Sequence, residues 1–165
     1  MAPKPIIQYL LLYLEMLKKV FGDNLVSMCL YGSVARGSFD EGSDIDVLLV
    51  VSNLPPEIDL RIARVTDLKM EIKKTEIYMM LKSRRLPTLI SDVILTPEEV
   101  SSHPPILLDI VEDGLILYDK DFFLSRELSL LKNRLNELGA RRIKGKHGFY
   151  WILKPDLKLG DVVRI

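Results

Sequence analysis

Two carboxylates lie one residue apart at the start of an aliphatic run, in Ser43-Asp44-Ile45-Asp46, which continues to Val51. Side chains two apart in a strand point to the same face, so the Cα atoms of Asp44 and Asp46 would be about 7 Å apart. Neighbouring carboxylates repel each other and resist desolvation unless a cation lies between them. Ligands that are all oxygen suit Mg²⁺ or Mn²⁺. The pair therefore predicts a divalent cation site.

A glycine and a serine precede this pair by a short loop. Gly32 ends an apolar run over residues 25–31, and Ser33 begins a turn toward an expected short helix. Backbone N–H groups at such a turn bind phosphate, and a serine hydroxyl adds a donor. A glycine leaves room for a phosphate to approach the backbone. Arg36 either completes the anion site or braces the loop by pairing with an acidic residue. A phosphate cradle beside two carboxylates predicts a metal-bound nucleoside triphosphate.

Gly-Ser, ten residues and Asp-x-Asp form the signature of the DNA polymerase beta-like nucleotidyltransferase superfamily. The stretch from Gly32-Ser33 to Asp44-Ile45-Asp46 has this spacing. With Ala35-Arg36-Gly37 and Ser43, the string resembles the minimal nucleotidyltransferase branch of that superfamily, over residues 30–51. The resemblance implies a nucleotidyltransferase fold and a nucleotide site made of Gly32, Ser33, Arg36 and Ser43.

The resemblance also implies a third carboxylate on a neighbouring strand, which activates the attacking hydroxyl. Asp92 lies inside an apolar run over residues 88–95, where an acid is costly to bury without a partner. Neighbouring strands are about 4.8 Å apart, so Asp92 would reach the pair from an adjacent strand. We therefore expect Asp44, Asp46 and Asp92 to be the catalytic and metal-binding residues. Asp109 and Asp113 are rivals for the third place, although both are typical of a helix surface or a turn.

The elements that must position these residues follow from hydrophobic spacing and turn signals. Helical spacing predicts helices over residues 5–21, 58–81, 106–111 and 122–138, and β-branched or aliphatic runs predict strands over 25–31, 45–51, 88–95 and 114–118. Thr96 and Pro97 predict the cap and first residue of a further helix. This order predicts an α/β (α+β) fold with a small mixed β-sheet flanked by helices. We expect residues 1–120 to form the catalytic core and residues 121–165 to pack on it as a helix and basic tail.

Composition restricts the class of protein. The chain has 165 residues, of which 48% are hydrophobic and 28% charged, as in one globular domain. Its single cysteine, Cys29, excludes an intramolecular disulfide and fits a reducing, cytoplasmic location. The apolar run over residues 6–14 is too short to span a bilayer, so we expect no membrane association.

The charge of the chain balances overall, with 23 basic and 23 acidic residues, but one segment is biased. Between Lys132 and Lys158 lie eight basic and two acidic residues, with Phe149, Tyr150 and Trp151 among them. Basic and aromatic residues together are typical of surfaces that bind a nucleic acid or a triphosphate, although a solvated face is the simpler interpretation. We expect this basic tail to contact an acceptor or a partner rather than to form the catalytic centre.

These observations predict metal-dependent transfer of a nucleoside monophosphate from a nucleoside triphosphate to an acceptor hydroxyl, with release of pyrophosphate. The resemblance implies a possible protein partner, a HEPN-type protein of a two-component system that receives AMP. A second copy of the chain, a nucleic acid or a small molecule are alternative acceptors or partners. The rival hypothesis is an antitoxin-like binding module with little turnover. Mutually repelling carboxylates argue against that module, because a binding surface has no need of them.

Overall fold

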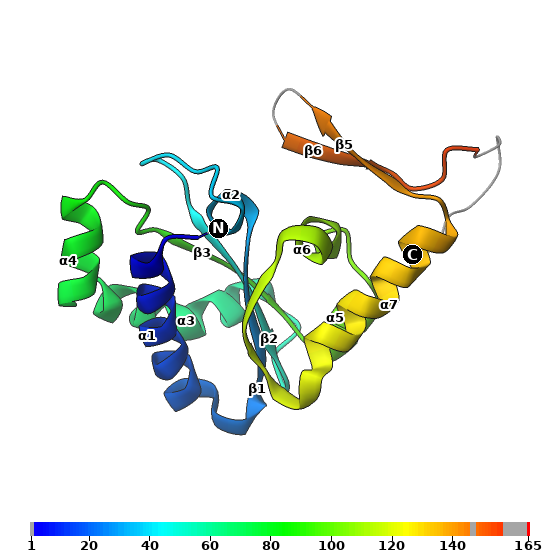
Figure 1. The fold of residues 1–165 in the computed structure, drawn as a ribbon. Helices are drawn as coiled ribbons and strands as arrows, with labels where there is room; N and C mark the ends of the chain where they lie inside the picture. Colours follow the sequence, from blue (N-terminus) through cyan, green and yellow to red (C-terminus); the bar gives the residue numbers. More distant parts are fainter. Residues whose placement is uncertain (1, 146–147, 157–164) are drawn as a thin grey trace.

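The computed structural model describes residues 2–145, 148–156 and 165. At its centre is a four-stranded sheet in the order β3-β2-β1-β4, formed by β1 (Leu25–Tyr31), β2 (Ile45–Val51), β3 (Ile90–Leu95) and β4 (Leu115–Asp119). β1 is antiparallel to both β2 and β4, whereas β2 and β3 are parallel. The predicted small mixed sheet with flanking helices is therefore confirmed (Figure 1).

Helices cover both faces of this sheet (Figure 1). One face carries α1 (Lys4–Phe21), α3 (Ile58–Ile72) and α4 (Glu76–Ser83). The other carries α5 (Pro97–Ser101), α6 (Leu107–Asp113) and α7 (Phe123–Glu137). Short 3-10 turns, η1 (Gly22–Asn24) and η2 (Lys120–Phe122), precede β1 and α7. None of the helices in the described part of the chain combines the length and apolarity needed to cross a bilayer.

The central strand β2 is buried on both sides, as its continuous aliphatic sequence predicts. Val47 and Leu49 pack into the cluster that α1 completes with Ile6, Leu10 and Leu17. Leu48 and Val50 pack on the opposite cluster, with Leu107, Ile110 and Leu131 of α6 and α7. Because side chains alternate along a strand, even-numbered residues of β2 face α6 and odd-numbered residues face α1.

Several predicted elements have different boundaries in the structure. The helix predicted over residues 58–81 is two helices, because Thr75 starts a new helix and its hydroxyl accepts from the N–H of Tyr78 at 3.4 Å. The strand predicted from residue 88 begins at Ile90. The predicted Thr96 cap is confirmed as a capping box, in which the hydroxyl of Thr96 accepts from the N–H of Glu99 at 3.2 Å and the carboxylate of Glu99 accepts from the N–H of Thr96 at 2.8 Å.

The tail folds into a hairpin, which sequence reasoning did not predict. Its strands β5 (Arg141–Gly145) and β6 (Gly148–Ile152) form a separate antiparallel sheet beyond α6 (Figure 1). The indole N–H of Trp151 donates to the carbonyl of Leu108 at 3.1 Å, and Arg142 pairs with Asp113. These contacts attach the hairpin to α6. Lys146, His147 and Lys158, which belong to the basic tail, lie outside the described residues.

Candidate active site

The carboxylate of Asp46 lies against Gly32 at one end of the sheet. Asp46 is paired with Tyr31, the last residue of β1, and the chain then turns into the short helix α2 (Gly32–Arg36). Gly32 has a φ of +74°, and a Cβ at this position would collide with Oδ2 of Asp46 and lie 3.1 Å from its Cγ. Only a glycine combines this backbone angle with so close a contact. The Gly-Ser turn and a predicted carboxylate therefore meet in the fold.

The surroundings of Asp46 disfavour its ionised form. Partial burial raises the pKa of Asp46, the charge of Asp44 raises it further, and Asp109 on α6 adds to this, while Arg36 acts in the opposite direction. Like charges gathered in a partly desolvated place are what a cation site requires. The oxygen donors of Asp44 and Asp46 fit Mg²⁺ or Mn²⁺. Within the described ranges no group of three His, Cys, Asp or Glu side chains is placed to hold a metal, so a metal site at Asp44 and Asp46 stays a prediction.

Asp92 does not join this pair. In the parallel register, Asp92 is opposite Val47, and the neighbour of Asp46 on β3 is Ser91. The side chain of Asp92 therefore faces α1 and α3, where it pairs with Lys69 at 2.7 Å and accepts from the hydroxyl of Tyr13 at 3.0 Å. Burial raises the pKa of Asp92, and Lys69 and Tyr13 oppose that shift. The expectation that Asp92 completes a three-carboxylate site is corrected by this register.

The two rivals for the third place differ from each other. Asp109 is exposed on α6, on the same side of the sheet as Asp46, and its charge acts on Asp46. Asp113 is held by Arg142 and lies 3.7 Å from Arg36, and these partners lower its pKa, with Arg142 the main cause. Asp109 is therefore the rival whose charge acts on the pair, whereas Asp113 binds Arg142 of the hairpin and Arg36 of α2. The ion pair with Asp113 supports the bracing alternative for Arg36.

Ser43 closes the turn that precedes Asp44. Its hydroxyl accepts from the N–H of Asp40 at 3.0 Å and lies 3.0 Å from the Oδ1 of Asp40, to which it donates. These bonds orient the chain as it enters β2, and a contact between Ser43 and a nucleotide stays a prediction.

A cleft of about 410 Å³ opens beside the Gly-Ser turn. Its lining comes from the α2 region and from the hairpin: Ser33, Arg36, Ser38, Lys144, Gly145, Gly148 and Phe149. The guanidinium of Arg36 lies 5.7 Å from the ring centroid of Phe149. Sequence reasoning placed Lys144 and Phe149 in a basic, aromatic segment, but not beside Ser33. The charge bias was the available signal, and nothing local specified where that segment docks.

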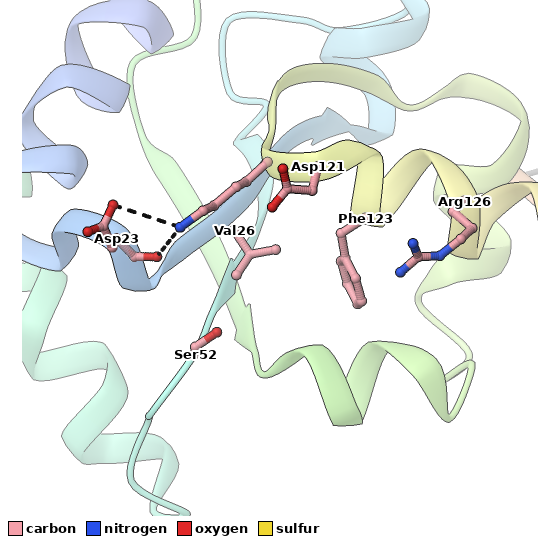
Figure 2. Close-up of a pocket in the computed structure, with 7 residues that line it drawn as sticks. Asp23, Val26, Ser52, Asp121, Phe123 and Arg126 are labelled. Atoms are coloured by element: carbon pink, nitrogen blue, oxygen red, sulfur yellow. Dashed lines mark hydrogen bonds and ion pairs between the residues drawn. The ribbon is translucent and has the colours of Figure 1, made fainter.

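A second cavity, of about 330 Å³, lies at the other end of β1, about 20 Å away along the strand. Figure 2 shows Asp23, Val26, Ser52, Asp121, Phe123 and Arg126 around it. Its lysine, Lys120, donates to the carbonyl of Asp23 at 3.0 Å. The carboxylate of Asp119 accepts from the N–H groups of Leu124 and Ser125, both at 2.9 Å, so the start of α7 is already satisfied. This arrangement offers no catalytic set.

A third cavity, of about 390 Å³, lies between α3 and β3. The buried Arg61 at its wall is bound to the carboxylate of Glu99 at 2.7 and 3.0 Å and to the carbonyls of Pro55 and Ile94 at 2.6 and 3.2 Å. These bonds tie α3 to β3 and α5, which is a structural role.

Known proteins similar in sequence to this chain include a domain family and two relatives. The family model of the nucleotidyltransferase domain matches residues 13–135. The "Putative protein adenylyltransferase MJ1305" of Methanocaldococcus jannaschii is 34% identical over 122 residues, which are 73% of this chain and 76% of the relative. The "Putative protein adenylyltransferase MJ0141" of the same organism is 47% identical over 36 residues, which are 22% of this chain and 36% of that relative.

Solved structures with a similar arrangement include a toxin–antitoxin complex with AMP-PNP, at 14% identity and a TM-score of 0.47, covering 77% of this chain and 90% of the other. Another is described as a "putative nucleotidyltransferase from Sulfolobus solfataricus", at 20% identity and a TM-score of 0.36, covering 73% of this chain and 92% of the other.

Proposed function

Because the chain belongs to the nucleotidyltransferase domain family, we propose that it transfers the AMP of ATP to a hydroxyl of a protein, with release of pyrophosphate. The observation that carries this proposal is the contact of Asp46 with Gly32, which brings a partly desolvated carboxyl group to the Gly-Ser turn. The protein acceptor is supported by the relative that shares 34% identity over most of both chains and is named a protein adenylyltransferase.

The proposed roles follow the placement of the side chains. Ser33 and the Gly-Ser turn bind the triphosphate, and Arg36 faces the same cleft. Asp44 and Asp46 would hold Mg²⁺ or Mn²⁺, which when bound offsets the negative charge of the triphosphate and of the departing pyrophosphate. Asp109, an exposed acid on α6 whose charge acts on Asp46, would receive the proton of the acceptor hydroxyl.

The reaction balances with these groups. The acceptor oxygen forms a bond to the α-phosphorus, the bond from that phosphorus to the bridging oxygen breaks, and the bridging oxygen leaves with pyrophosphate. The proton of the hydroxyl passes to a carboxylate and then to solvent. A HEPN-type protein, the partner expected from the sequence resemblance, is the first acceptor to test, before a second copy of the chain.

The test is transfer of label from α-³²P-ATP to the acceptor protein, with pyrophosphate measured in the same tube. Asp44→Asn and Asp46→Asn are expected to abolish both signals because the charged pair is lost. Asp67→Asn is the control, since Asp67 is an exposed acid on α3. Transfer at the wild-type rate by Asp46→Asn would contradict the assignment. A wild-type protein that binds the HEPN-type protein without releasing pyrophosphate would favour the binding module instead.

A further inference from the structure

We propose that the β5–β6 hairpin is the second wall of the triphosphate site and that Lys144 binds the terminal phosphates of the nucleotide. The proposal rests on the proposed function for the identity of the ligand. The cleft beside Ser33 has a volume of about 410 Å³, within the range of small-molecule sites. Its two walls come from segments more than a hundred residues apart: the α2 region with Ser33 and Arg36, and the hairpin with Lys144 and Phe149.

The pairing of the two hairpin strands determines which side chains face this cleft. Arg142 is opposite Trp151 and Lys144 is opposite Phe149, so these four side chains share one face. Arg141, Tyr150 and Ile152 lie on the other, exposed face. The hairpin thus presents Arg142 and Lys144 on the face that carries its contacts to the rest of the protein and lines the cleft, and a third cation, Arg141, on the opposite face.

Three of the four inward side chains have partners that dock the hairpin. Arg142 pairs with Asp113 and lies 4.0 Å from the ring centroid of Phe149. The guanidinium of Arg36, on α2, lies 5.7 Å from the centroid of the same ring. The indole N–H of Trp151 donates to the carbonyl of Leu108. These contacts hold the hairpin against α6 and α2, so the cleft has a defined second wall.

Lys144 is the fourth inward side chain, and it takes no part in these docking contacts. It is exposed, it lines the cleft, and in the described part of the chain no carboxylate lies within ion-pair distance of its ammonium group. A cation without a carboxylate partner, facing a cleft with a second cation at Arg36, suits a ligand that carries several negative charges. A lysine ammonium group on a flexible stem is a point charge that binds a phosphate without a fixed orientation.

The position of the lysine favours the terminal phosphates over the nucleoside. Asp46 and Gly32 mark the place where the reacting phosphate lies under the proposed function, and the cleft extends from Ser33 away toward the hairpin. A nucleic acid would instead use a continuous basic surface, including the outward Arg141. The two-walled cleft and the inward face of Lys144 therefore favour a polyphosphate, and a nucleic acid becomes an outcome of the test.

The experiment measures the dissociation constants of ATP, AMP and inorganic triphosphate by calorimetry in the presence of Mg²⁺. Lys144→Ala is expected to weaken binding of ATP and triphosphate about tenfold, the usual effect of losing one hydrogen bond to a charged group, and to leave AMP unchanged. Lys144→Arg should recover most of the affinity, because it keeps the charge. Arg141→Ala is the matched control, since it removes a cation from the outward face of the same strand, and it should bind all three ligands like the wild type.

The outcomes separate this inference from the proposed function. Lys144→Ala that binds ATP and triphosphate as tightly as Arg141→Ala does overturns the inference, while transfer by the wild type would still stand. Equal losses for AMP and ATP also overturn it, because the lysine would then contact the nucleoside part. If the wild type transfers no AMP, triphosphate binding that depends on Lys144 still supports the inference. A single-stranded RNA whose binding depends on Lys144, with triphosphate binding unaffected, would assign the lysine to a nucleic acid.

Discussion

Gly32→Ala should destabilise the protein more than Gly139→Ala does, although the two glycines have similar positive φ angles. Their φ angles are +74° and +66°. A Cβ at Gly139 would have nothing within 4 Å, whereas a Cβ at Gly32 would collide with Oδ2 of Asp46. The difference between the two variants therefore isolates the contact between the Gly-Ser turn and the carboxylate.

The size of each effect follows from these contacts. A left-handed conformation costs an L-residue about 1–2 kcal/mol, which is the whole expected cost at Gly139. At Gly32 the same cost applies, and Asp46 must also leave its position because the new Cβ would be 3.1 Å from its Cγ and 3.3 Å from its Cβ. Moving a side chain off its rotamer adds about 1 kcal/mol and a backbone shift adds more, so we expect about 3 kcal/mol in total. In a chain of this length each kcal/mol lowers the melting temperature by about 2–4 °C.

The assay is thermal unfolding without metal, followed by the AMP transfer assay. Gly32→Ala should melt well below Gly139→Ala and lose transfer, and Gly139→Ala should retain transfer. In an Asp46→Ala background, Gly32→Ala should cost only a little more than Gly139→Ala, because Oδ2 and Cγ are gone and only the Cβ of residue 46, at 3.3 Å, remains close. Equal melting temperatures for the two glycine variants, or an extra cost that is undiminished in the Asp46→Ala background, would refute the reasoning.

Three further predictions concern the carboxylates. Lys69→Met leaves the carboxylate of Asp92, whose side chain is 2% exposed, without its cation, and should cost about 3 kcal/mol in denaturant unfolding at pH 7; the added change Asp92→Asn should recover part of that loss. Asp92→Asn alone should keep transfer, because its carboxylate faces away from Asp46, and loss of transfer with unchanged stability would return Asp92 to the catalytic set. The pKa of Asp46 is raised in the folded state, so the folded protein binds a proton at this carboxyl more tightly than the unfolded chain does. The resulting contribution to the free energy of unfolding is present in acid and is lost as the pH rises through the raised pKa. Without metal, Asp46→Asn should therefore be at least as stable as the wild type at pH 7, with the difference narrowing in acid. A variant that melts well below the wild type at pH 7 would show instead that a structural bond holds Asp46.

Local sequence determined the parts of the site that neighbours along the chain can specify. The aliphatic run of β2 begins and ends as predicted, at Ile45 and Val51, because a strand buried on both faces needs apolar residues throughout. Gly32 follows β1 because the turn requires a positive φ. The capping box at Thr96 forms within four residues. Each of these signals acts over a few residues, so the sequence alone was sufficient for the fold class and for the Gly-Ser turn. The contact of that turn with Asp46 depends on the pairing of β1 with β2.

Tertiary structure decided the remaining placements, because they depend on contacts between segments far apart in the chain. Asp92 was predicted on the correct strand, but its face depends on the register of β3 against β2, and a shift of one residue reverses every side chain of a strand. Lys144 belonged to a visible basic segment, yet its position beside Ser33 depends on Arg142 reaching Asp113 and Trp151 reaching Leu108. Charge and hydropathy along the sequence record that such residues exist. Which of them meet is determined by packing over distances that no local pattern encodes.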